Sequence, residues 1–81
     1  MQTLPSLTPE MLVPRLGDYL VENRYITTEQ LQLALQNQAD RRNRGESVLL
    51  GRVIIDLGYI DQNRLDQAIT EQILRLRNAL Q

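Results

Sequence analysis

One segment of the chain occurs twice, and this repeat constrains the fold more than any other feature. Residues 16–38, LGDYLVENRYITTEQLQLALQNQ, align with residues 50–72, LGRVIIDLGYIDQNRLDQAITEQ, at a constant offset of 34 without a gap. Seven of the 23 aligned positions are identical: Leu16/Leu50, Gly17/Gly51, Tyr25/Tyr59, Ile26/Ile60, Leu31/Leu65, Ala34/Ala68 and Gln38/Gln72. Three more exchange one aliphatic residue for another: Leu20/Ile54, Val21/Ile55 and Leu35/Ile69. We therefore infer two copies of one supersecondary unit.

Each copy has the pattern of a helix-turn-helix unit. Apolar residues at helical spacing predict a short helix that begins near Leu16 and an equivalent one that begins near Leu50. Gly58 suits the left-handed position that ends a helix. Thr27 with Gln30 has the sequence of a capping box, and Asp61 is a favourable N-cap residue. Longer helices are therefore expected at roughly 28–41 and 62–79.

These elements predict one small all-α domain over residues 1–81, with about four main helices and a pseudo-twofold relation between its halves. Repeat 1 occupies residues 15–38, a polar linker 39–48, repeat 2 residues 49–72, and an extension of the last helix 73–81. The period of 34 is also that of tetratricopeptide repeats. We reject that class because it places an aromatic residue where this chain has Leu20 and Ile54.

Composition argues against catalysis. The chain has no histidine, cysteine or lysine, which carry most acid–base and nucleophilic chemistry at neutral pH. Its only serines, Ser6 and Ser47, lie in expected loops, and its ten acidic residues are scattered over expected solvent faces. We therefore predict a binding module rather than an enzyme, with no metal and no resident cofactor.

Charge and hydropathy limit the partners. The net charge of −1 provides no general attraction to nucleic acid or anionic lipid. The N-terminus lacks the pattern of a signal peptide, and no apolar run approaches the ~18 residues of a membrane span. The expectation is a cytoplasmic protein that is not inserted in a membrane.

The linker contains Arg41, Arg42 and Arg44; a solvated linker is the preferred interpretation and a basic patch for an anionic ligand is the alternative.

The combined pattern of Arg-Leu-Gly, aliphatic steps and then Leu-x-x-x-Leu-x-x-Gln resembles the N-terminal domain of type II secretion and type IV pilus assembly ATPases. It is most similar to the subtype that binds cyclic di-GMP through two tandem motifs. The first copy matches at Arg15, Leu16, Gly17, Leu20, Val21, Ile26, Leu31, Leu35 and Gln38, and the second at Leu50, Gly51, Ile54, Ile55, Gly58, Ile60, Leu65, Ile69 and Gln72. The chain departs from the motif at Leu49, where the second arginine is expected, at Arg24, where a glycine is expected, and in its longer spacer, 39–48.

The resemblance implies a cyclic di-GMP sensor that signals through a partner protein of the pilus, secretion or signalling machinery. The binding residues would be Arg15, Leu16, Gly17, Leu31, Leu35, Gln38, Leu50, Gly51, Leu65, Ile69 and Gln72. The guanidinium of Arg15 suits the two acceptors on a guanine edge. The glycines would let the ligand approach the backbone, and the aliphatic residues would form an apolar floor. The glutamine amides would read a base edge or a phosphate.

The alternative function is a protein-interaction adaptor of the same machinery without a nucleotide ligand. A leucine or isoleucine stripe at helical spacing is more often core than ligand floor, and duplication also preserves core packing. Periodicity alone does not separate these two interpretations.

The last helix continues beyond the second motif. Leu65, Ile69, Gln72, Leu76 and Ala79 form one stripe with the spacing of a helix-packing seam. Residues 73–81 are therefore predicted to form a homodimer or partner-docking seam. The competing interpretation is that they cover the domain's own core.

Overall fold

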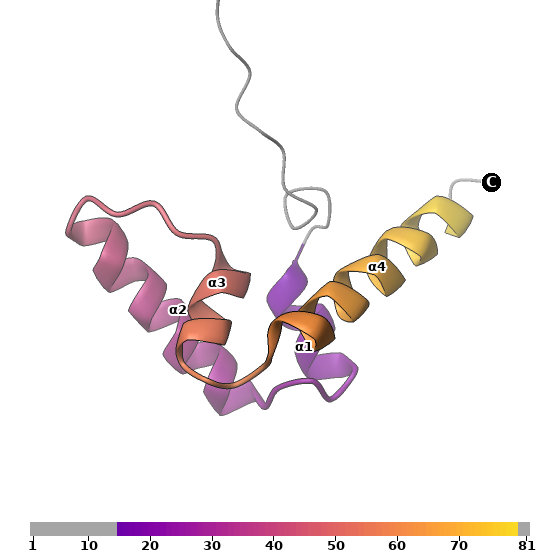
Figure 1. The fold of residues 1–81 in the computed structure, drawn as a ribbon, viewed down its shortest axis with the longest axis horizontal. Helices are drawn as coiled ribbons and strands as arrows, with labels where there is room; N and C mark the ends of the chain where they lie inside the picture. Colours follow the sequence, from indigo (N-terminus) through magenta and orange to yellow (C-terminus); the bar gives the residue numbers. More distant parts are fainter. Residues whose placement is uncertain (1–14, 80–81) are drawn as a thin grey trace, which may run out of the picture.

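The computed structural model describes residues 15–79, and this part of the chain forms four α-helices and no strand. The helices are α1 (Leu16–Glu22), α2 (Thr28–Asn43), α3 (Leu50–Asp56) and α4 (Gln62–Ala79), as Figure 1 shows. The all-α fold class with four main helices is thereby confirmed. Residues 1–14 and 80–81, which complete the expected domain, lie outside the described residues. No helix of the described part is both long and apolar enough to cross a membrane.

The long helices begin where their capping residues predict. The Oγ1 atom of Thr27 accepts a hydrogen bond from the backbone N–H of Gln30 at 3.1 Å, and the Gln30 side chain accepts one from the N–H of Thr27 at 2.9 Å. In the second copy, Oδ1 of Asp61 accepts from the N–H of Arg64 at 2.7 Å. The end of α2 differs slightly from expectation: the helix continues to Asn43, so the first half of the polar linker is helical.

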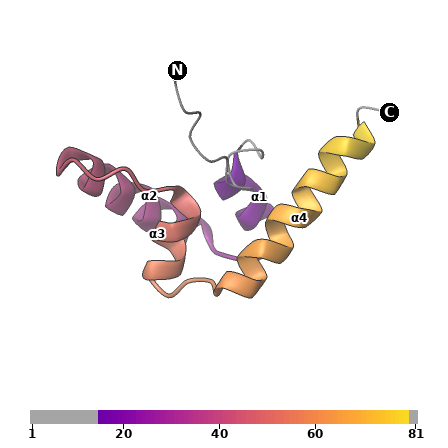
Figure 2. The same cartoon turned by 45° about the horizontal axis from the view of Figure 1, so that its top comes forward.

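The two copies exchange packing partners. Helix α2 of the first copy packs on α3 of the second, and α4 of the second packs on α1 of the first, while α1 also contacts α3 and the α2 helix of its own copy. In Figures 1 and 2 the long helices diverge as two arms, with the short helices between them. Because each long helix lies on the other copy's short helix, the halves have the pseudo-twofold relation that the repeat predicts.

The repeated residues form most of the hydrophobic core. Leu20 and its equivalent Ile54 are fully buried, as are Ala34 and Ala68. The other buried apolar residues are Leu16, Tyr19, Ile26, Leu31, Val53, Ile60, Leu65 and Ile69. Much of the identity between the copies is therefore explained by packing. This makes the positions that recur without being buried more informative about function.

Candidate functional site

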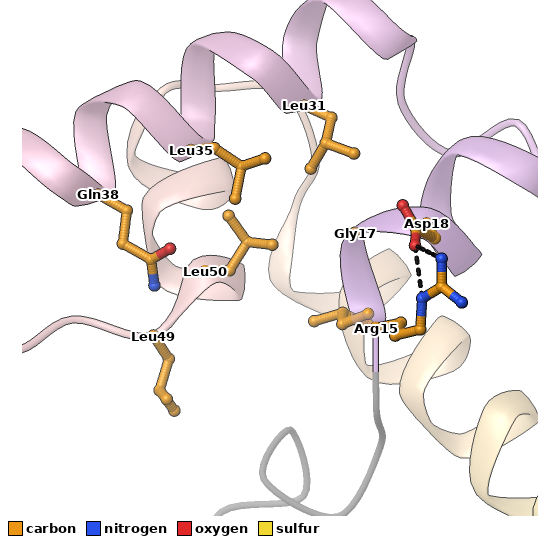
Figure 3. Close-up of a pocket in the computed structure, with 9 residues that line it drawn as sticks. Arg15, Gly17, Asp18, Leu31, Leu35, Gln38, Leu49 and Leu50 are labelled. Carbon is orange, nitrogen blue, oxygen red and sulfur yellow. Dashed lines mark hydrogen bonds and ion pairs between the residues drawn. The ribbon is translucent and has the colours of Figure 1, made fainter.

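An open hollow of about 360 Å³ lies where the start of α1, the middle of α2 and the start of α3 meet. Its lining is drawn in Figure 3 and consists of Arg15, Leu16, Gly17, Asp18, Leu31, Leu35, Gln38, Leu49 and Leu50. Seven of the eleven binding residues predicted from the sequence are in this set. They come from three helices and from both copies, so the fold brings most of the first motif together with the beginning of the second.

The floor of the hollow is apolar and depends on a close contact at Gly17. A Cβ atom on Gly17 would lie 2.6 Å from Cδ1 of Leu31 and 3.1 Å from Cδ2 of Leu50. Glycine at this position is therefore needed for the packing of the protein's own leucines, in addition to any space that it leaves for a ligand. Leu35 remains 45% exposed, which leaves an apolar surface open to solvent at this site.

A single arginine projects from the rim of the hollow. Arg15 is the N-cap residue of α1, and its side chain is 82% exposed. Its Nε and Nη2 atoms both lie 2.8 Å from Oδ2 of Asp18, three residues further along the chain. Exposed ion pairs of this kind contribute about 0–1 kcal/mol. The guanidinium can therefore exchange Asp18 for a ligand at low energetic cost.

Gln38 holds the wall of the hollow in place. Its Nε2 atom donates a hydrogen bond of 2.8 Å to the backbone carbonyl of Val48, which lies just before Leu49 and Leu50. This bond ties α2 to the segment that leads into α3. One amide donor that the sequence analysis assigned to the ligand is thus used within the protein.

The second-copy residues lie elsewhere. Leu65 and Ile69 are in the hydrophobic core, 4% and 5% exposed, and Gly51 is buried in α3. Gln72 borders a separate depression together with Arg15, Asp18, Tyr19 and Glu22. The hollow is therefore asymmetric: it contains the first motif and the Leu49–Leu50 segment, but not these four predicted residues.

Two lining residues, Asp18 and Leu49, were not among the predicted binding residues. Arg15 and Asp18 are three residues apart, a spacing at which opposite charges on a helix can pair, so the sequence contained a signal for this ion pair. Leu49 was noted only as a departure from the motif.

Within residues 15–79 there is no group of three acidic side chains that could hold a metal ion.

A polar cluster joins α1 to α4 on another side of the molecule. Oε2 of Glu71 accepts hydrogen bonds from the hydroxyls of Tyr19 at 3.3 Å and Tyr25 at 3.1 Å. Burial and the bond to Glu71 raise the pKa of Tyr25, and burial with the nearby Glu71 charge raises the pKa of Tyr19 despite Arg75. Hydrogen bonds from Gln67 and Tyr25 lower the pKa of Glu71.

The arginines around the linker are mostly paired with acids. Arg41 lies 3.0 Å from Asp56 of α3, and Arg44 lies 3.5 Å from Glu46. Arg52 also pairs with Asp56, at 3.1 Å. These pairs favour the solvated linker over a basic patch for an anionic ligand.

The end of α4 leaves apolar side chains in solvent. Ile73 packs against the core, but Leu74 is 50% exposed and Leu76 is 38% exposed. The homodimer or docking seam over residues 73–81 stays a prediction, and its last two residues lie outside the described part.

The chain is similar to two curated proteins of Escherichia coli. It is 42% identical over 69 residues to bacteriophage adsorption protein B of strain K12, and equally to bacteriophage N4 adsorption protein B of O157:H7. Each match covers 84% of this chain but 8% of the relative. A match of that extent must include most of both copies, and it lies within a small part of each relative. No model of a known protein family matches the chain, and no solved structure matches it.

Proposed function

We propose that the chain is a non-enzymatic module that binds cyclic di-GMP and passes its ligand state to a partner protein or to the remainder of a larger protein. The observation that carries this proposal is the composition of the hollow. Arg15, Gly17, Leu31, Leu35 and Leu50 line one open site. The resemblance to secretion and pilus ATPases implies that these residues bind the nucleotide.

The chemistry of the hollow suits a purine nucleotide. The planar guanidinium of Arg15 can donate two parallel hydrogen bonds to O6 and N7 of guanine. Leu35 and the adjacent leucines offer an apolar surface on which a purine face can pack. Leaving Asp18 costs Arg15 little because that ion pair is exposed.

The relatives support the second half of the proposal. Their matched segment is a small part of a much longer protein, in each case one named for bacteriophage adsorption. A module that binds a ligand without transforming it acts by changing its contacts with other polypeptide. We infer that ligand occupancy of the hollow controls such a contact.

Calorimetric titration with cyclic di-GMP tests the proposal. The wild-type chain should release heat and show a higher melting temperature with the ligand. Arg15→Ala should weaken binding about tenfold to a hundredfold, because hydrogen bonds to a charged group contribute about 1.5–3 kcal/mol. Arg42→Ala is the matched control, since Arg42 is exposed on α2 and does not line the hollow. The proposal is contradicted if about 1 mM ligand produces no heat and no thermal shift. It is also contradicted if Arg15→Ala and the wild type have equal affinities.

A further inference from the structure

The two ends of the hollow differ in polarity. Of its nine lining residues only Arg15 and Asp18 are charged, and they lie together at one end. Figure 3 shows Leu49 on the opposite side of the lining from this ion pair, beside Leu50 and Gln38. Arg15 and Leu49 are equivalent positions of the two copies, because each precedes the first residue of its short helix. The pseudo-twofold relation is therefore broken at the pair of positions that flank the hollow.

The charged end can distinguish guanine from adenine. Guanine presents two acceptors, O6 and N7, to a guanidinium, whereas adenine replaces O6 with an N6 amino donor. Asp18 adds a carboxylate that can accept from the N–H groups on the neighbouring edge of the same guanine. Adenine offers the guanidinium of Arg15 one acceptor, N7, and its N6 amino group can donate to Asp18, so the advantage of guanine is the second hydrogen bond that it accepts from Arg15.

The Leu49 end has no comparable group. Leu49 and Leu50 carry no polar side-chain atoms, and one of the two amide N–H groups of Gln38 is used by the carbonyl of Val48. Arg52, the nearest arginine along the chain, pairs with Asp56 and does not line the hollow. A purine at this end would be held mainly by apolar contact, and the remaining N–H and the Oε1 atom of Gln38 provide both a donor and an acceptor, so they can serve the edge of either base.

From this asymmetry, and resting on the proposed function, we infer that the site reads guanine on only one of two bases and accepts a mixed cyclic dinucleotide with one guanine and one adenine. Cyclic GMP–AMP should bind almost as well as cyclic di-GMP. A factor of about two in favour of the symmetric ligand is expected, because it can enter in two equivalent orientations and the mixed ligand in one. Cyclic di-AMP has no guanine to accept two hydrogen bonds from Arg15 and should bind about fivefold more weakly or worse.

Titration of the wild-type chain with the three cyclic dinucleotides, under one set of conditions, tests this inference. Affinities for cyclic di-GMP and cyclic GMP–AMP within about threefold, with cyclic di-AMP at least about fivefold weaker, are the expected result. The inference is overturned if cyclic GMP–AMP binds as weakly as cyclic di-AMP, since both bases would then be read as guanine. It is also overturned if cyclic di-AMP binds as well as cyclic di-GMP. Absence of binding by all three would instead remove the proposed function itself.

Leu49→Arg provides the matched variant. The substitution supplies the equivalent of Arg15 and should strengthen cyclic di-GMP binding by about fivefold or more relative to cyclic GMP–AMP. An equal gain for all three ligands would show that the new charge attracts phosphates and that position 49 does not face a base, which contradicts the inference. The Tm of the variant, measured without ligand, shows whether its fold is intact.

Discussion

At the scale of single residues, two residues other than glycine have a left-handed backbone in the described part of the chain: Arg15, with a φ of +55°, and Arg24. Arg24 follows α1 with a φ of +63°, and its equivalent Gly58 follows α3 with a φ of +80°. Glycine enters this left-handed region freely, whereas a residue with a Cβ atom is disfavoured there by about 1–2 kcal/mol. Arg24 is exposed, and no hydrogen bond or ion pair of its side chain is found within the described residues. The first copy therefore retains the turn geometry without the residue that suits it.

Substitutions at these two positions should change the free energy of unfolding in opposite directions. Arg24→Gly should raise the free energy of unfolding by about 0.5–1 kcal/mol, because it removes the backbone strain but adds some chain entropy to the unfolded state. Gly58→Ala should lower it by about 1 kcal/mol, because space is available for a Cβ there and only the φ is unfavourable. Urea denaturation measures both. Arg24→Ala is the control for loss of charge and should change little; a gain equal to that of Arg24→Gly would contradict the argument from strain.

At the scale of elements, the contact of α4 with α1 is reinforced by the Glu71 cluster. One carboxylate oxygen accepts from two tyrosine hydroxyls that belong to α1 and to the turn after it. The guanidinium carbons of Arg64 and Arg75 lie over the rings of Tyr25 and Tyr19, 5.2 Å and 5.4 Å from the ring centres. In the pseudo-equivalent contact of α2 with α3, Asn37 occupies the position of Glu71 and borders a depression together with Tyr59. The charged version of this contact is present in one half only.

The cluster should make stability depend on pH at both extremes. The pKa of Glu71 is lowered below its ordinary value of 4.5, so its contribution is present above that value and is lost as the pH falls through the folded-state pKa. The tyrosine pKa values are raised above 10.0, so their contribution is present below pH 10.0 and is lost as the pH rises through the folded-state values.

Glu71→Gln tests the acidic limb. The variant should have a lower Tm than wild type at pH 7, because an amide is a weaker acceptor for two hydroxyls, and the difference should shrink as the pH is lowered below 4.5. Asp66→Asn is the matched control, since Asp66 lies on the same helix and accepts a bond only from Gln62, also of α4. If the two variants lose the same Tm at pH 7, the cluster does not stabilise the contact between α1 and α4.

At the scale of the whole molecule, the exchange of packing partners makes each copy dependent on the other. The fully buried residues Leu20 and Ile54 lie on the short helices, each of which packs against the other copy's long helix. Separated from each other, the copies would expose most of this core. A unit of that size rarely buries enough apolar surface to fold alone.

The fragments 1–44 and 45–81 should therefore show little helical circular dichroism when they are measured separately. Mixed at equal concentration, they should recover a helical signal that depends on concentration, because the contacts of α2 with α3 and of α1 with α4 can re-form between two chains. The intact chain is the reference for full helicity. A monomeric, well-folded fragment would show that the copies are independent.

The local features of this fold could be predicted from the sequence because short-range rules determine them. Helix spacing located four helices, and the caps at Thr27 and Asp61 located the beginnings of the two long ones. The repeat indicated that the halves would be equivalent, and the core residues follow from its apolar positions. Even the left-handed position after α3 was evident, because Gly58 relieves a restriction that acts within one residue.

The composition of the site depended on tertiary structure. Two motif copies in sequence are compatible with two equal half-sites, but the folded chain places Leu65 and Ile69 in the core and leaves Leu35 exposed beside Arg15 and Leu49. Likewise, the sequence pattern predicted that Gln38 reads a ligand, but only the tertiary structure shows that its amide donates a hydrogen bond to the carbonyl of Val48. Periodicity specifies which face of a helix is apolar, but only the packing of several helices decides whether that face is covered by protein or left open to a ligand.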